Sequence, residues 1–189
     1  NINIANLQAQ INSLPKEPLN QTELTSLSFM REEEKLARDV YITLYNKWGV
    51  TIFTNISNSE QTHMDAILML LNKYSQIDPV GSNGVGVFAN TTLQTLYNQL
   101  VTQGNASVVD AYKVGATIED LDIFDLKTAL ISIDNQDIRL VYEMLTKGSR
   151  NHMRSFYKNI LNVGGTYTPL YITQAEFDAI INSPMETGF

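Results

Sequence analysis

One short stretch, Ser59-Glu60-Gln61-Thr62-His63, places a glutamate and a histidine three residues apart inside an apolar helical pattern. Residues at this spacing lie on one helix face, so the Glu60 carboxylate and the His63 imidazole point the same way. The apolar residues of the same face are Ile56, Ile67, Leu70, Leu71 and Tyr74. Both polar groups therefore face the core, where a carboxylate is costly unless it is paired, protonated or bound to a metal ion.

The composition limits which groups can neutralise that buried charge. The 189 residues, 43% hydrophobic and 17% charged, are enough for one domain with a sizeable core. The net charge of -7 disfavours nucleic acid and anionic membranes as partners, and no apolar run is long enough to span a membrane. The chain has no cysteine, so a bound metal must be held by oxygen and nitrogen atoms.

Helical periodicity predicts an all-α fold with four long helices and no strand. We expect the long helices at about residues 22–48, 57 or 58–75, 107–133 and 134–161. A short helix at about 92–103 lies between the second and third, and the capping box Thr173-x-x-Glu176 opens a small final helix. These elements describe a four-helix bundle with a long crossover, which lets the second and third helices run parallel. We assign residues 1–20 to an N-terminal arm and 21–189 to the bundle domain.

The apolar stripes of the four long helices are interrupted by a small set of ionisable residues near their middles, namely Glu34, Glu60, His63, Glu119, Asp122 and His152. Two divalent cations would neutralise the four carboxylates, and two neutral imidazoles would complete the ligand set. Such oxygen and nitrogen ligands suit iron or manganese, with zinc as an open alternative. The other explanation is a core ion network in which Arg38 or Arg150 supplies the positive charge.

Two motifs resemble the ferritin-like superfamily. The stretch Glu34-Lys35-Leu36-Ala37-Arg38-Asp39-Val40-Tyr41 resembles the first-helix signature of rubrerythrin-type proteins, in which a ligand glutamate precedes Ala-Arg and Tyr at this spacing. Glu60-x-x-His63 resembles the second-helix ligand motif. More closely, the chain resembles the uncharacterised DUF2202 family of ferritin-like proteins, at residues 29–41, 59–66, 118–123 and 148–152.

This resemblance implies a di-metal carboxylate site whose ligands are Glu34, Glu60, His63, Glu119 and His152. The chain departs from the superfamily on the fourth helix, where Ser149-x-x-His152 stands in place of the usual Glu-x-x-His. One carboxylate is therefore missing. We expect Asp122, one turn beyond Glu119, to replace it; otherwise the second metal position is weak or empty.

Several residues near the candidate ligands are expected to lie outside the ligand set. Helical phase predicts that Glu32 and Glu33 face solvent, because they lie about 200° and 100° around the helix from Glu34. Glu143 is likewise expected at the surface. Tyr41 is either a core aromatic residue or a hydrogen-bonding or oxidisable group beside Glu34.

Three functions remain open from the sequence. The first is a redox enzyme, an oxidase or peroxidase whose iron or manganese reacts with O2 or peroxide. The second is a metal-binding or storage protein without turnover, and the third is a partner-binding bundle with a vestigial site. The partners we expect are metal ions and O2 or peroxide, with a homodimer left open. The first residue is Asn rather than Met, which favours an exported or cell-surface protein over a cytoplasmic one.

Overall fold

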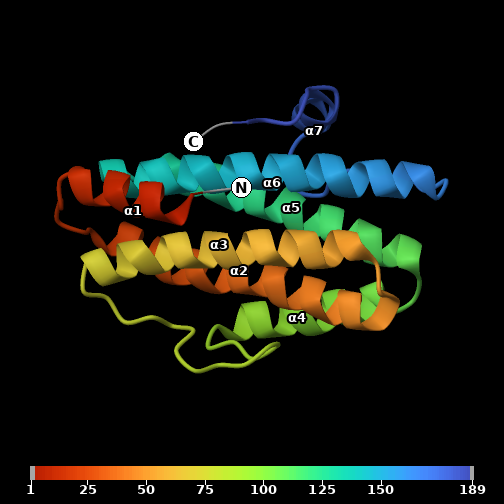
Figure 1. The fold of residues 1–189 in the computed structure, drawn as a ribbon, viewed down its shortest axis with the longest axis horizontal. Helices are drawn as coiled ribbons and strands as arrows, with labels where there is room; N and C mark the ends of the chain where they lie inside the picture. Colours follow the sequence, from red (N-terminus) through yellow and green to blue (C-terminus); the bar gives the residue numbers. More distant parts are fainter. Residues whose placement is uncertain (1–2, 188–189) are drawn as a thin grey trace.

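The computed structural model describes residues 3–187, and every regular element in this range is a helix (Figure 1). The helices are α1 (Ile4–Ser13), α2 (Gln21–Trp48), α3 (Thr51–Lys73), α4 (Thr91–Gly104), α5 (Val108–Leu130), α6 (Gln136–Asn162) and α7 (Gln174–Ile181). The long helices α2, α3, α5 and α6 pack side by side, with α2 against α3 and α5, and α6 against α5 and α3. The predicted all-α class is confirmed for the described residues.

Local signals in the sequence explain several of the helix ends. Asn20 and Glu23 form a capping box at the start of α2, and Gly49 ends the helix in the left-handed conformation with φ 66°. Ser107 caps α5, and the predicted capping box of Thr173 and Glu176 opens α7. These residues satisfy backbone groups that the helix itself leaves without partners.

The predicted start of α3 at Ser57 or Asn58 is wrong, because α3 already begins at Thr51. Only Gly49 and Val50 separate it from α2, and Val50 makes no side-chain hydrogen bond that caps the helix. Ser57 lies inside α3, where its hydroxyl donates to the Thr54 carbonyl. Serine favours helix caps, but Ser57 is accommodated inside α3 because its hydroxyl bonds to the backbone of the same helix.

The crossover between α3 and α5 is built against α2. It contains the segment 75–90 and α4, and α4 packs on α2 and α5. Glu32 of α2 accepts hydrogen bonds from the backbone N–H groups of Ala89 and Asn90, at 2.6 and 2.9 Å. Asp39 accepts one from the Gly86 N–H at 2.9 Å. In Figure 1, α3 and α5 run in the same direction, as the sequence predicted.

Glu32 is 3% exposed, so the prediction that it faces solvent is wrong. The physical reason is that the crossover covers the side of α2 that helical phase assigns to water. Two backbone donors take the place of the lost hydration of the Glu32 carboxylate.

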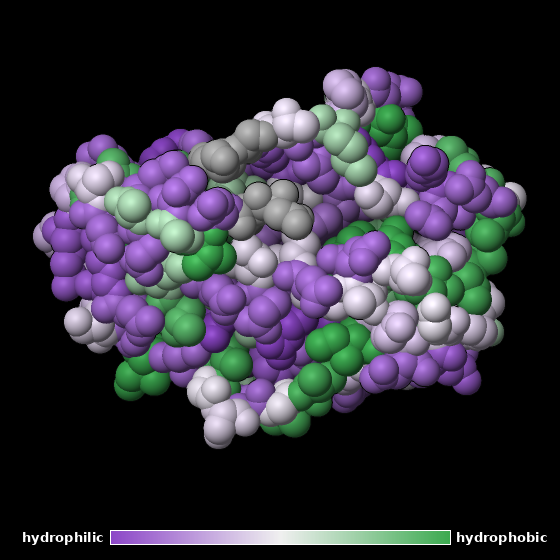
Figure 2. All heavy atoms as spheres, in the orientation of Figure 1, coloured by the Kyte–Doolittle hydropathy of each residue, from purple (hydrophilic) through white to green (hydrophobic). Residues whose placement is uncertain are grey.

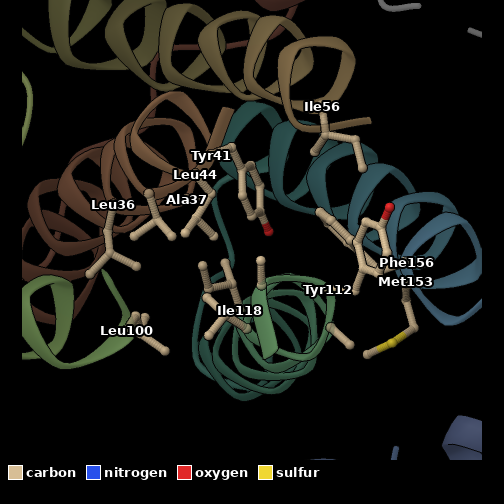
Figure 3. Close-up of a cluster of buried hydrophobic side chains, with 14 of the residues drawn as sticks. Leu36, Ala37, Tyr41, Leu44, Ile56, Leu100, Tyr112, Ile118, Met153 and Phe156 are labelled. Carbon is tan, nitrogen blue, oxygen red and sulfur yellow. The ribbon is translucent and has the colours of Figure 1, made fainter. Parts of the chain in front are cut away.

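The core consists of two hydrophobic clusters with a polar layer between them. One cluster contains Tyr41, Phe53 and Phe156, whose rings pack together; Figure 3 shows Tyr41 and Phe156 within it. The other contains Leu70 and Leu145 among its members. Along α3, the first cluster ends at Ile56 and the second begins at Ala66, and the opening motif lies between them. On α3, Glu60 and His63 thus interrupt the core between the two clusters.

The N-terminal segment packs onto this core through α1. Leu7 and Ile11 are buried, and α1 contacts α3 and α6. The Lys73 ammonium group donates to the carbonyls of Ile11 and Leu14, which ties α1 to the end of α3. The division into an arm and a bundle domain at residue 20 stays a prediction.

The surface is mixed in polarity. On the face in Figure 2, hydrophilic residues predominate and hydrophobic ones are scattered among them. Among residues 3–187, none of the helices combines the length and apolar character needed to cross a membrane.

Candidate metal centre

The structure brings five of the predicted residues together in two groups. The first group is Glu34, Glu60 and His63, and the second is Glu60, Glu119 and His152. Within each group, the candidate ligand atoms all lie within 4.8 Å of one another. All five residues are buried, with His152 the most exposed at 9%. Glu60 is common to both groups, so it lies between two candidate metal positions.

Each imidazole presents its Nδ1 atom to two carboxylates. The His63 Nδ1 atom is 3.0 Å from an oxygen of Glu34 and 2.7 Å from Oε2 of Glu60. The His152 Nδ1 atom is 2.8 Å from Oε1 of Glu60 and 3.4 Å from an oxygen of Glu119. The two oxygens of Glu60 thus point to different histidines, and the ring centroids of these histidines are 5.5 Å apart.

The far nitrogens of the two rings have different surroundings. The Nε2 atom of His152 lies 3.0 Å from the Ser59 hydroxyl, which fixes the orientation of that ring. The Nε2 atom of His63 has no hydrogen-bond partner among the described residues and faces the backbone of Gly148. A Cβ atom at position 148 would lie 2.5 Å from this nitrogen, so glycine is required for the close approach of α6 to the ring.

Several polar atoms at the centre lack hydrogen bonds within residues 3–187. They are both oxygens of Glu60 and of Asp122, Oε2 of Glu119, Nδ1 of His152 and Nε2 of His63. Most of the close approaches between imidazole and carboxylate are therefore ion-pair contacts without hydrogen-bond geometry. Buried polar groups nearly always have a partner, because leaving one unpaired costs about 1–3 kcal/mol. A cation held between these atoms would provide that partner.

Burial and crowding of charges shift the pKa values at the centre. Burial is the main cause that raises the pKa of Glu34 and of Glu119 to about 7. Burial acts in the same sense on Glu60, but the imidazoles of His152 and His63 outweigh it and lower the pKa of Glu60 below its usual range. Burial lowers the pKa of His152, whereas Glu60 and Glu119 outweigh it and raise that pKa to about 10. The three carboxylates of the centre thus outnumber the two imidazoles whose positive charge would offset their negative charge.

Asp122 lies beside the centre but belongs to neither three-residue group. Its side chain is 1% exposed, and both carboxylate oxygens lack hydrogen bonds. Burial, followed by the charges of Glu33 and Glu34, raises the pKa of Asp122. Ser149 is also buried, and its hydroxyl donates to the Leu145 carbonyl. The predicted replacement of the missing carboxylate by Asp122 stays a prediction.

The two arginines of the alternative ion network are engaged elsewhere. The Arg38 guanidinium donates to Asp39 and to Gln61. The Arg150 guanidinium donates to Glu186 near the end of the described chain. The observed bonds of these two guanidinium groups do not involve the five clustered residues, so the structure does not favour a core ion network built on them.

Tyr41 is hydrogen-bonded to the cluster. Its hydroxyl donates to Oε1 of Glu119 at 2.5 Å, and Figure 3 shows the side chain reaching from α2 toward α5. The bond fixes one oxygen of Glu119 and leaves the other directed at His152. Of the two interpretations drawn from the sequence, the structure shows Tyr41 as a hydrogen-bonding residue that is also part of the aromatic core.

Glu33, like Glu32, was misplaced by the reasoning from helical phase. It is 2% exposed rather than facing solvent, and neither carboxylate oxygen has a hydrogen-bond partner in the described chain. Burial and the adjacent Asp125 carboxyl raise the pKa of Glu33. The sequence held a signal for the acidic partner of Glu33 rather than for its burial. Asp122 and Asp125 are three residues apart, so they share a face of α5. Glu143 is exposed, as predicted.

The fold and site define an all-helical protein with buried acidic and histidine groups that could hold metal ions. A family model described as "Uncharacterized protein domain (DUF2202)" matches residues 23–184, and the chain belongs to this family. It is 57% identical over 178 residues to "Uncharacterized protein MJ0754" of Methanocaldococcus jannaschii, covering 94% of this chain and 96% of the relative. The crystal structure of hypothetical protein MJ0754 matches with a TM-score of 0.90 over 92% of this chain and 99% of that one.

Proposed function

We propose that this protein is a ferritin-like di-metal carboxylate protein, with iron or manganese held by Glu34, Glu60, His63, Glu119 and His152. The observation that carries the proposal is the pair of buried acid and histidine groups that share Glu60. Each group offers carboxylate oxygens and one imidazole nitrogen, the donor set of non-haem iron and manganese sites.

The orientation of Glu60 supports two neighbouring metal positions. Oε2 is directed toward His63 and Oε1 toward His152, so Glu60 would offer an oxygen to each of the two positions. Glu34 would complete one position and Glu119 the other. Four long helices with one long crossover are also the arrangement in which ferritin-like proteins place such ligands on facing helices.

The surroundings of the candidate centre support a redox function. Bound iron or manganese would supply reactivity toward O2 or peroxide. The chain contributes a core from which water is largely excluded, since Glu34, Glu60, His63 and Glu119 are each at most 1% exposed. Tyr41 holds a proton at its hydroxyl against Glu119, where it orients the carboxylate that faces His152.

Metal binding without turnover is the second candidate. It is favoured by the absence of Asp122 from both ligand groups and by Ser149, which offers no carboxylate at the fourth helix. The two positions would then be unequal, and zinc or another divalent ion would suit the stronger one.

Metal analysis of the purified protein tests the proposal. Glu60→Ala and His63→Ala should lose most of the bound metal, because each removes a ligand from the shared centre. Glu143→Ala is the matched control, since this glutamate is exposed and pairs only loosely with Arg139 at 3.5 Å. Equal loss in the control, or wild-type protein that binds no divalent ion, would contradict the metal centre.

A visible spectrum recorded with and without peroxide then separates the two candidates. A redox-active metal whose spectrum changes with peroxide supports an oxidase or peroxidase. Tightly bound zinc, or a metal whose spectrum does not respond, supports binding without turnover.

A further inference from the structure

A surface cavity of about 560 Å3 lies among α2, α4 and α5, and one of its lining residues, Glu33, directly precedes the candidate ligand Glu34. Three threonines of α4, Thr91, Thr92 and Thr95, form its exposed polar side. Of the described residues that line it, only Glu33 and Asp125 carry a charged side chain. The volume is ample for a cation with its water shell, because one water molecule occupies about 30 Å3 in the liquid.

The two carboxylates occupy the inner side of this cavity. Glu33 is 2% exposed and has no hydrogen-bond partner for either oxygen in the described chain, whereas Asp125 is partly exposed. The two carboxyl groups face one another closely enough to share a hydrogen bond if one is protonated. No lysine or arginine is among the lining residues described. The partly exposed Asp125 carboxylate, together with the buried carboxylate of Glu33 behind it, offers the oxygen ligands that a hard divalent cation prefers.

The cavity is linked to the centre by neighbouring carboxylates. On α5, Asp125, Asp122 and Glu119 follow at intervals of three residues and so lie on one side of the helix. On α2, Glu33 precedes the candidate ligand Glu34. Asp122 is close enough to Glu33, Glu34 and Glu119 to feel the charge of each. A series of carboxylates therefore leads from the cavity to the candidate ligands.

We propose that Glu33 and Asp125 form an entrance site for a hydrated divalent cation, which then moves past Asp122 to the metal centre. The inference rests on the proposed metal centre, but it assigns a role to residues outside its ligand set. It also accounts for Asp122, a buried carboxylate with unpartnered oxygens that belongs to neither ligand group. In the competing explanation no cation enters through the cavity, and Glu33 and Asp125 only share a proton. Replacing these two residues would then not affect metal loading.

The rate of metal loading tests this entrance. Metal-depleted protein is mixed rapidly with Co(II), and the visible absorbance of bound cobalt is followed. The isosteric variants Asp125→Asn and Glu33→Gln should load about tenfold more slowly, because they remove the charge that concentrates cations at the cavity. The same number of ions should be bound at the end. Glu143→Gln is the control and should load like wild type, since that carboxylate lies on the exposed surface.

A second pair of variants leaves both carboxylates intact. Thr92→Lys places a positive charge at the mouth of the cavity and should also slow loading. Thr102→Lys adds the same charge to the same helix outside this cavity and should not. This pair carries the test if Glu33→Gln fails to fold, because both threonines are exposed.

The outcomes separate the entrance from the centre itself. Wild-type rates in both Asp125→Asn and Thr92→Lys would overturn the entrance while leaving the metal centre standing. A lower final number of bound ions in Asp125→Asn would make Asp125 a permanent ligand and would also overturn it. Wild-type protein that binds no cobalt would refute the metal centre, and the entrance with it.

Discussion

Substitution of Gly148 by alanine should weaken metal binding although it touches no ligand bond directly. Gly148 lies inside α6, where its missing side chain leaves room for the His63 ring. In an exposed helix interior, replacing glycine by alanine stabilises a protein by about 1 kcal/mol. At this position the added Cβ would lie 2.5 Å from Nε2 and 2.6 Å from Cε1 of His63.

The size of the effect follows from these distances. Carbon atoms in contact prefer separations of about 3.5–4.0 Å, so the His63 ring or α6 must move by about 1 Å. A functional site tolerates displacements of about 0.5 Å, and disturbing the support of a metal ligand typically lowers affinity about 10- to 100-fold. Overpacking costs about 1–3 kcal/mol, which exceeds the gain in helix propensity. We therefore expect weaker metal binding and a metal-depleted protein about 1 kcal/mol less stable than wild type.

Calorimetric titration with Mn(II) and urea unfolding of the metal-depleted protein measure the two quantities. Ser149→Ala is the matched control, because it changes a buried neighbour on α6 without adding an atom. The control should keep the affinity of wild type. If Gly148→Ala also binds Mn(II) with wild-type affinity, either His63 is not a ligand or its ring does not lie against α6 as described.

Further predictions concern stability, stoichiometry and hydrogen bonding. Metal removal should lower the unfolding free energy by about 3 kcal/mol relative to protein at free metal about 100-fold above Kd, measured by calorimetry. The depleted protein should regain stability from about pH 8 down to about pH 5.5, because Glu34 and Glu119 have folded pKa values of about 7, above the usual 4.5. Ionising them therefore destabilises the fold increasingly above pH 4.5 and fully above pH 7; a steady loss on acidification would contradict this. Asp122→Ala should empty one metal position. Ser149→Glu should tighten the weaker position, provided that the core has room for the longer side chain. Equilibrium dialysis measures both, and unchanged ion counts and affinities would exclude Asp122 as a ligand. Tyr41→Phe should weaken Mn(II) binding about tenfold at neutral pH and less at higher pH, because the Tyr41 hydroxyl lowers the pKa of Glu119; equal weakening at all pH values would indicate a packing effect alone.

The sequence predicted the long helices where apolar periodicity and caps agreed. Helix α2 starts and ends within a residue of its predicted bounds, since Gly49 stops it and hydrophobic residues recur along one face. The start of α3 could not be read in the same way, because a two-residue link between helices leaves no space for a polar cap. The parallel course of α3 and α5 followed from the length of the crossover alone.

Helical phase predicted that the side chains of Glu34, Glu60, His63, Glu119 and His152 meet in the core, and the structure brings these five together. It failed for Glu32 and Glu33. Phase assigns a residue to a side of its own helix and is silent about what covers that side. The crossover and α4 pack against α2 through contacts far apart in the sequence, such as the bonds from Ala89 and Asn90 to Glu32. These contacts turn an outward face of α2 into an interior one.

The run Glu32, Glu33 and Glu34 gives three identical side chains three different surroundings within one helical turn. Glu32 anchors the backbone that leads into α4, Glu33 lines the cavity, and Glu34 faces His63. Each successive residue is rotated by about 100°, so a slip of α2 by one position would move every glutamate to different surroundings and bring Arg31 or Lys35 to one of the three points. Although the three side chains are identical, the site therefore does not tolerate a change in the register of α2. An insertion or deletion within α2 before this run should be far more damaging than any single conservative substitution in it.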